Sequence, residues 1–140
     1  MQSTLSPELI NAYAATEFRV LGPSQFTLRI GRPSPELLAA YAHLVTDKAT
    51  FITAWNPFSE ATDPATNRQR QDQLRHDVAT LGFNAWEGIG IDPSSEWEGE
   101  ESLLVFGMDR DQASGLGRTY QQNAIVWMDL DAVPCLVLLR

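Results

Sequence analysis

The chain has 140 residues, 44% of them hydrophobic and 20% charged, which predicts one globular domain spanning residues 1–140. Its net charge of −8 disfavours contact with phosphate backbones and anionic lipid surfaces, so we expect neither nucleic acid nor a membrane as a partner. No apolar run approaches the roughly 20 residues that span a bilayer, and the N-terminus lacks a signal-peptide pattern, so we expect a cytoplasmic protein.

Helix and strand signals alternate in the first part of the chain. Ser-Pro-Glu at residues 6–8 combines a capping side chain, a proline at the first helical position and an early carboxylate, and the same phrase returns at residues 34–36. Two helices are therefore predicted to begin there. Between them, residues 17–21 and 26–30 alternate apolar and polar side chains around a Gly-Pro-Ser turn, which predicts a hairpin.

The middle of the chain predicts two further strands around a long helix. Residues 50–55 favour a strand that ends at Asn56-Pro57, because proline cannot donate to a β-ladder. A polar loop follows, and residues 67–81 then predict a helix with a narrow apolar stripe. Residues 83–91 predict the next strand, which leads into an acidic loop.

The last part of the chain contains a buried strand, a helix and a second hairpin. Residues 102–107 are apolar almost throughout, as in a strand that is covered on both faces. Residues 109–122 predict a helix, and residues 123–128 and 133–139 predict the two final strands. This order of elements predicts an α+β fold, a two-layer sandwich with a mixed sheet of about six or seven strands and helices mainly on one face.

Polar residues beside three of these strands are predicted to converge. If the strands at residues 102–107 and 123–128 run parallel on either side of their connecting helix, Glu100 and Gln122 approach the sheet from the same edge. Asn56 joins that edge if its own strand runs antiparallel to the other two. On that condition, the sequence predicts a polar cluster of these three side chains.

Glu100 is the strongest candidate for chemistry, because a carboxylate that enters a buried strand can have a raised pKa and act as an acid or a base. The alternative is a structural carboxylate that pairs with Arg118 or Arg70, or that caps backbone N–H groups of the loop. Asn56 could present its amide to a ligand or belong to an ordinary Asn-Pro turn. Arg118 follows Gly-Leu-Gly and could hold an anion, although the segment lacks the order of a phosphate-binding loop.

The other candidate residues have structural explanations. Asn123 follows the last predicted helix, and a helix stop explains it because asparagine tolerates left-handed backbone. Gln122 would suit a brace for the loop at Asn56. The lone cysteine, Cys135, is predicted to be a small buried hydrophobe, and it leaves no partner for a disulfide.

An acidic segment surrounds Glu100 and is a candidate cation site. Carboxylate oxygens are the ligands that calcium and magnesium prefer, but the spacing does not fit a calcium-binding loop. We therefore expect no metal and no cofactor. The acidic residues of this segment are Asp92, Glu96, Glu98, Glu100 and Glu101.

Three polar motifs carry a resemblance to a known family. They are Thr53-Ala54-Trp55-Asn56-Pro57 with Ser59, then Trp97 with Glu100 and Ser102, and finally Gln122-Asn123-Ala124, with Asn67 and Arg70 between the first two. With these motifs in this order, over about residues 13–127, the chain resembles the bacterial family of domain of unknown function 3293. The resemblance implies kinship and no particular activity.

Two functions follow as hypotheses from the sequence. The first is a non-enzymatic domain that recognises a protein or a small ligand at the polar strand-end edge. The second is an enzyme with Glu100 as general acid or base, in which Arg118 or Asn67 fixes an anionic small molecule. The acidic second half could also dock a basic protein. The sequence specifies no oligomeric state. The candidate residues for ligand or partner binding are Trp55, Asn56, Asn67, Arg70, Glu100, Arg118, Gln122 and Asn123.

Overall fold

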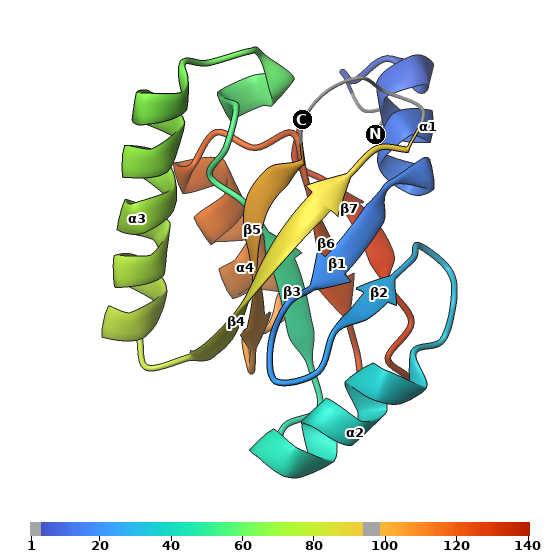
Figure 1. Cartoon of the computed structure of the whole chain (residues 1–140). Helices are drawn as coiled ribbons and strands as arrows, with labels where there is room; N and C mark the ends of the chain where they lie inside the picture. Colours follow the sequence, from blue (N-terminus) through green and yellow to red (C-terminus); the bar gives the residue numbers. More distant parts are fainter. Residues whose placement is uncertain (1–3, 94–98) are drawn as a thin grey trace.

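The computed structural model describes residues 4–93 and 99–140. Within them the helices are α1 (Pro7–Ala15), α2 (Pro35–Leu44), α3 (Pro64–Thr80) and α4 (Arg110–Thr119), with a short 3₁₀ helix, η1 (Pro57–Ser59). The strands are β1 (Glu17–Val20), β2 (Phe26–Leu28), β3 (Ala49–Ile52), β4 (Asn84–Ile91), β5 (Glu100–Phe106), β6 (Ala124–Met128) and β7 (Cys135–Leu138). Helices and strands follow one another in the predicted order (Figure 1).

Three of the helices begin with the same two signals, a capping side chain followed by a proline. The Ser6 and Ser34 hydroxyls accept hydrogen bonds from backbone N–H groups three residues on, at 3.2 and 3.1 Å, as the sequence predicts. Asp63 caps α3 in the same way, at 2.9 Å. For this reason α3 begins at Pro64, one turn before the start predicted at residue 67.

All seven strands belong to one sheet, in the order β2-β1-β4-β5-β3-β6-β7. The α+β class and the number of strands confirm the prediction. Its expected mixed pairing does not occur, since every pairing between the described strands is antiparallel. The physical reason is the position of β3, which lies between β5 and β6 and pairs with both. These two strands therefore run in the same direction without touching.

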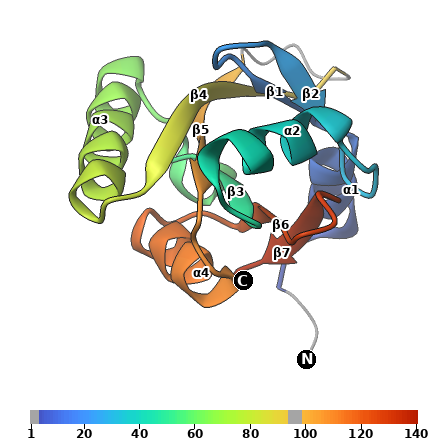
Figure 2. The same ribbon diagram turned by 90° about the horizontal axis from the view of Figure 1, so that it is seen from below.

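The sheet curls, and helices cover both of its faces (Figures 1 and 2). Leu37 and Tyr41 of α2 pack inside the curl, whereas Leu74 and Val78 of α3 and Ala113 of α4 pack against the convex face. The helices are thus not mainly on one face, which corrects the predicted two-layer sandwich. The cause lies in β3, β5 and β6, which send apolar side chains to both faces, so that each face needs a cover.

An aromatic pair fills the inside of the curl. The rings of Phe18 and Phe51 meet edge to face with their centroids 5.2 Å apart. Gly88 leaves room for this contact, since a Cβ atom there would lie 2.7 Å from Cε2 of Phe51. α2 closes one end of the curl, and α1, which has no buried residue, lies at the other end (Figure 1). The α2 end is a packed core, and the α1 end is covered more loosely.

The two edges of the sheet are β2 and β7. Cys135 begins β7 and is exposed, so the prediction that it is buried is wrong. Because β7 has a neighbouring strand on one side only, its first residue has less cover than a residue of a central strand, which contributes to the exposure. Among the described residues, none of the helices has the length and the apolar character needed to cross a membrane.

Candidate functional site

A cavity of about 290 Å³ lies between α1 and the concave face of the sheet. Phe18, Phe51 and Val126 line it from the strands, and Leu9 and Ala12 line it from α1. Polar side chains surround this apolar part. They come from the ends of β3 to β6, from the loop after β3 and from α1, and they include Tyr13, Thr53, Asn56, Ser59, Asp92, Glu100, Ser102 and Gln122.

The strand directions bring the predicted polar residues to one edge. β3 ends where β5 and β6 begin, because it is antiparallel to both. Nδ2 of Asn56 donates a hydrogen bond to Oε1 of Glu100 at 3.2 Å. Gln122 lines the same cavity, and its Nε2 donates to the carbonyl of Trp55 at 3.3 Å. The condition set for the predicted cluster is therefore met in the structure.

Asn56 is held in one orientation by its surroundings. Its Oδ1 accepts hydrogen bonds from the backbone N–H of Thr62 at 3.1 Å and from Nδ2 of Asn67 at 2.9 Å. Its own backbone N–H donates to Oδ1 of Asn67 at 2.8 Å. Because a backbone N–H can only donate, Oδ1 must face Thr62, and the Asn56 amide nitrogen must face Glu100. Asn67 is 2% exposed and positions Asn56 rather than a ligand.

Glu100 is the acidic group that Asn56 contacts at this edge of the sheet. Burial raises the pKa of its carboxyl, and the hydrogen bond from Asn56 lowers that pKa by less. Within residues 4–93 and 99–140 the Glu100 side chain forms no ion pair, and its one hydrogen bond uses Oε1. Its second carboxylate oxygen, Oε2, is therefore available to the cavity that Glu100 lines.

The neighbouring carboxylate has the opposite environment. Glu101 points to the convex side, where its Oε2 lies 3.1 Å from a guanidinium nitrogen of Arg75 on α3. Strand alternation separates the two carboxylates, as expected for successive residues of β5. Glu101 is thus part of an ion-pair network on the outside of the sheet, whereas Glu100 faces the cavity.

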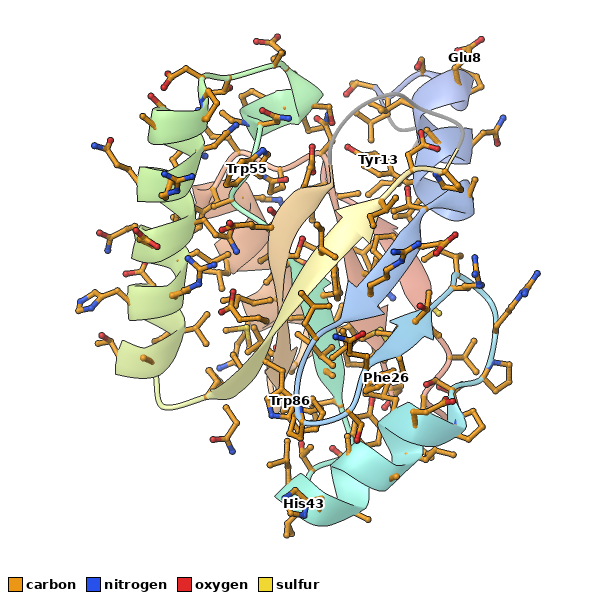
Figure 3. All side chains as sticks on the ribbon, viewed as in Figure 1. Glu8, Tyr13, Phe26, His43, Trp55 and Trp86 are labelled. Carbon is orange, nitrogen blue, oxygen red and sulfur yellow. The ribbon has the colours of Figure 1, made fainter. Side chains whose placement is uncertain are left out.

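Neither arginine proposed as a partner of Glu100 contacts it. Arg70 donates to the carbonyls of Ala54 at 3.0 Å and Tyr120 at 2.5 Å, and so ties the exit of β3 to the end of α4. Arg118 is exposed on α4 and does not line the cavity. Trp55, which follows Ala54, lies on the side of the strand ends away from α1 (Figure 3). These three side chains are not brought together around a ligand site.

A second chain of hydrogen bonds joins α1 to the loop after β3. The Tyr13 hydroxyl lies 2.5 Å from Oγ of Ser59, and Nδ2 of Asn123 donates to the same Oγ at 2.9 Å. Asn123 can only donate here, because its Oδ1 accepts from Arg140 at 3.3 Å. Tyr13 projects from α1 toward the strand ends (Figure 3). Burial raises the pKa of Tyr13, and the negative charge of Glu100 raises it further.

The loop that carries Asn56 and Ser59 has an uncommon backbone. Asn56, Phe58 and Ser59 have φ values of 46°, 56° and 60°, in the left-handed region that side chains rarely occupy. Such conformations persist where the surroundings fix them. Here the hydrogen bond from Phe58 N to the carbonyl of Gln121, at 2.6 Å, and the contacts of Asn56 and Ser59 provide that support.

Two residues of this site were not singled out from the sequence, namely Tyr13 and Gly90. Tyr13 fits the apolar stripe of a helix, so its position in the sequence does not indicate that its hydroxyl belongs to the site. Gly90 pairs with Glu100 across β4 and β5, and a Cβ atom there would meet its first neighbours only at 3.9 and 4.0 Å. The available signal was the Gly-x-Gly pattern at residues 88–90, because glycines two apart in a strand leave space on one face.

Part of the acidic segment lies outside the described residues, namely Glu96, Trp97 and Glu98. In the remainder of the chain, no group of three or more His, Cys, Asp or Glu side chains is arranged to hold a metal ion.

The fold and the cavity define an α+β protein in which a curled antiparallel sheet and its first helix enclose a partly polar cavity. The model of the family described as protein of unknown function (DUF3293) matches residues 52–125, more than half of the chain, and the chain belongs to this family. The match is shorter than residues 13–127, over which the resemblance was expected. No curated protein and no solved structure is detectably similar to the chain.

Proposed function

We propose that the protein binds a small molecule in the cavity between α1 and the concave face of the sheet. A carboxylate that is withdrawn from water without a cationic partner is destabilised, and this effect raises the pKa of Glu100. A ligand that hydrogen-bonds to Oε2 would offset the loss of water. The observation that supports binding most directly is Oε2 of Glu100, which has no hydrogen-bond partner among the described residues and belongs to the lining of the cavity.

The size of the cavity is compatible with this role. Its volume of about 290 Å³ lies just below the range for ligand pockets, roughly 300–1,000 Å³, which favours a small ligand. The groups around it are fixed before any ligand arrives, since Asn67 and Thr62 orient Asn56, and Asn56 holds Glu100. A site arranged in advance loses less conformational entropy on binding, which favours affinity for a small molecule.

The charges of the lining favour a different ligand from the anion expected in the enzyme hypothesis. Two carboxylates, Asp92 and Glu100, line the cavity, and among the described residues no Lys, Arg or His does so. Neither Arg118 nor Asn67 is available to fix an anion. We therefore favour a neutral or cationic molecule. The alternative occupant is one side chain inserted by a basic protein. The cytoplasmic location and the bacterial origin stay predictions.

A thermal-unfolding screen tests the proposal. Wild type, Glu100→Gln and Glu101→Gln would be heated with a panel of metabolites, amines and nucleotides. A ligand at about 100 times its dissociation constant adds roughly 2.7 kcal/mol of stability and raises the midpoint by several degrees. We expect a shift in wild type and in Glu101→Gln that is reduced in Glu100→Gln. Equal shifts in all three proteins would place binding elsewhere.

An enzyme that uses Glu100 as general acid or base is the second candidate. The observation in its favour is the Tyr13 hydroxyl, which belongs to the same cavity and shares a hydrogen bond with Ser59. A carboxyl with a raised pKa and a phenol could together move a proton and stabilise an oxygen that gains charge. Incubation of each ligand found in the screen, followed by mass and NMR analysis for exchanged protons or new products, separates this enzyme from a binding protein.

A further inference from the structure

The available hydrogen-bonding atoms of the cavity are mostly acceptors. Gln122 is 7% exposed, and its Nε2 donates to the carbonyls of Trp55 and Tyr120 at 3.3 and 3.1 Å. Carbonyls cannot donate, so this orientation of the amide is fixed, and Oε1 is the polar atom of Gln122 that remains. Among the described residues Oε1 has no hydrogen-bond partner. It adds a second acceptor to Oε2 of Glu100 in the lining of one cavity.

Two of the hydroxyls in the lining, those of Thr53 and Ser102, follow the same rule. Thr53 Oγ1 donates to a backbone carbonyl of β5 at 2.6 Å, and Ser102 Oγ donates to another at 3.0 Å. Each hydroxyl has a single hydrogen, so both face a ligand with lone pairs only. A ligand that brings donors is therefore complementary to this wall of the cavity. A ligand that brings acceptors would leave these groups unpaired, which is unfavourable.

The remaining wall is apolar. Phe51 and Val126 line the cavity from the sheet, and Leu9 and Ala12 do so from α1, where they are only half-buried. Since α1 has no buried residue, a bound apolar group would cover side chains that the protein itself leaves partly exposed. The cavity thus combines an acceptor-lined wall with an apolar one.

We propose that the ligand is a protonated amine with an apolar body. Its N–H groups bind Oε2 of Glu100 and Oε1 of Gln122, and its apolar part lies between Phe51 and α1. This inference rests on the proposed function, because it names the chemical class of ligand for the same cavity. Hydrogen bonds between an ammonium and a carboxylate are about twice as strong as neutral ones, so Glu100 would select for the cation.

Three probes of similar shape test the charge requirement: 2-phenylethylamine, 2-phenylethanol and 3-phenylpropanoate. Their dissociation constants would be measured at pH 8 by following the backbone amide signals of isotope-labelled protein, with Gly90 as reporter of the cavity. We expect the amine to bind at least about tenfold more tightly than the alcohol, and the carboxylate to bind most weakly. In Glu100→Gln the preference for the amine should fall to about twofold or less.

Two matched variants make the result specific. Glu101→Gln removes the same charge one residue away, from the convex side, and should keep the full preference. Gly90→Val fills the cavity opposite Glu100 and should weaken both the amine and the alcohol. The signals of each variant also show whether it is folded, so that a loss of binding is not confused with a loss of structure.

The pH dependence gives a further criterion. The titratable groups that line the cavity with Glu100, among the described residues, are Tyr13 of α1 and Asp92 after β4. An aliphatic amine stays protonated up to about pH 10, so it is charged throughout the acidic range. Affinity for the amine should fall as the pH is lowered and Glu100 takes up a proton, whereas affinity for the alcohol should not fall.

The outcomes separate the two proposals. If the alcohol binds as tightly as the amine, or no probe binds while the screen yields a ligand without a basic nitrogen, the amine inference is overturned and the cavity keeps its role. If Gly90→Val leaves the affinity of every bound compound unchanged, the cavity is not the site, and both proposals fail. Tighter binding of the carboxylate would also overturn the inference.

Discussion

Gly90 and Glu100 are cross-strand partners of β4 and β5, on the face of the sheet that lines the cavity. One residue of the pair supplies the half-buried carboxylate, and the other supplies the space in front of it. Gly88, two residues earlier on the same strand, differs from Gly90. The ring of Phe51 occupies the space that a side chain at residue 88 would need. The two glycines of β4 therefore have different functions, and alanine distinguishes them.

Gly88→Ala is expected to destabilise the fold, and Gly90→Ala is not. A Cβ atom at residue 88 would lie 2.7 Å from Cε2 of Phe51 and 2.9 Å from the carbonyl of Arg19, so the core must shift, at a cost of about 1–3 kcal/mol. At residue 90 its first neighbours lie at 3.9 Å or more. Urea unfolding of both variants measures the difference. Equal stabilities would contradict the assigned packing.

Asn67→Ala is expected to reduce the free energy of unfolding by about 1–3 kcal/mol, because it leaves the backbone N–H of the buried Asn56 without its acceptor. The exposed Asn84, changed to alanine, provides the matched control and should have little effect. Chemical denaturation measures both. The amide signal of Asn56 should also shift in Asn67→Ala, and the shifted signals should be confined to this loop. A general loss of packing at α3 would shift signals outside the loop as well.

Glu100→Gln is expected to stabilise the protein at neutral pH. Burial raises the pKa of Glu100 in the folded state, whereas the unfolded chain has an ordinary carboxyl pKa of roughly 4.3. The folded protein therefore holds this proton where the unfolded chain has released it, and the stability of wild type falls as the pH rises through that window. Glutamine does not titrate, so the advantage of the variant should vanish below about pH 4.

The control for this titration is Glu101→Gln, which removes a carboxylate that pairs with Arg75. Because that carboxylate has a cationic partner, its loss should not stabilise the protein at any pH. Unfolding free energies from pH 3 to pH 8 give both curves. A Glu100→Gln curve that is parallel to wild type would mean that water solvates the carboxylate freely.

Ser59→Ala is expected to loosen α1. The Ser59 hydroxyl connects Tyr13 to Asn123, at 2.5 and 2.9 Å, and its removal should cost about 1 kcal/mol. Amide hydrogen exchange should become faster in α1 and stay unchanged in α2, which has its own contacts with the sheet. Tyr13→Phe should have a similar effect, and the double variant should add little to either single change. Ser24→Ala, in an exposed turn, is the control.

The elements and the polar edge could be predicted because they depend on local signals. Ser6, Ser34 and the apolar run of β5 indicate their structures directly, and the joint position of Asn56 and Glu100 follows from strand direction. Pairing is different, since it is decided by side chains far apart in sequence. Nothing local states that β3 inserts between β5 and β6, which is why a mixed sheet was expected and an antiparallel one is found.

The cavity could not be predicted for a related reason. A void results from curvature and from the absence of side chains, and Gly90 carries the only local trace of it in β4. The polar residues of α3 are similarly ambiguous in sequence. Gln71 was not considered, yet its Oε1 accepts the buried N–H of Ala54 at 2.9 Å. Polar side chains of a helix that hydrogen-bond a neighbouring backbone look the same in sequence as those that face water.

The curl of the sheet is closed by α2 at one end and bordered by α1 at the other (Figure 1). A compartment of this shape is a cup, with a floor made by Phe18 and Phe51. A chain molecule cannot pass through a compartment that is closed at one end. A long flexible molecule could therefore engage it only by its tip, so that the chemistry of a terminus, rather than of a repeating unit along a chain, would decide what the protein accepts.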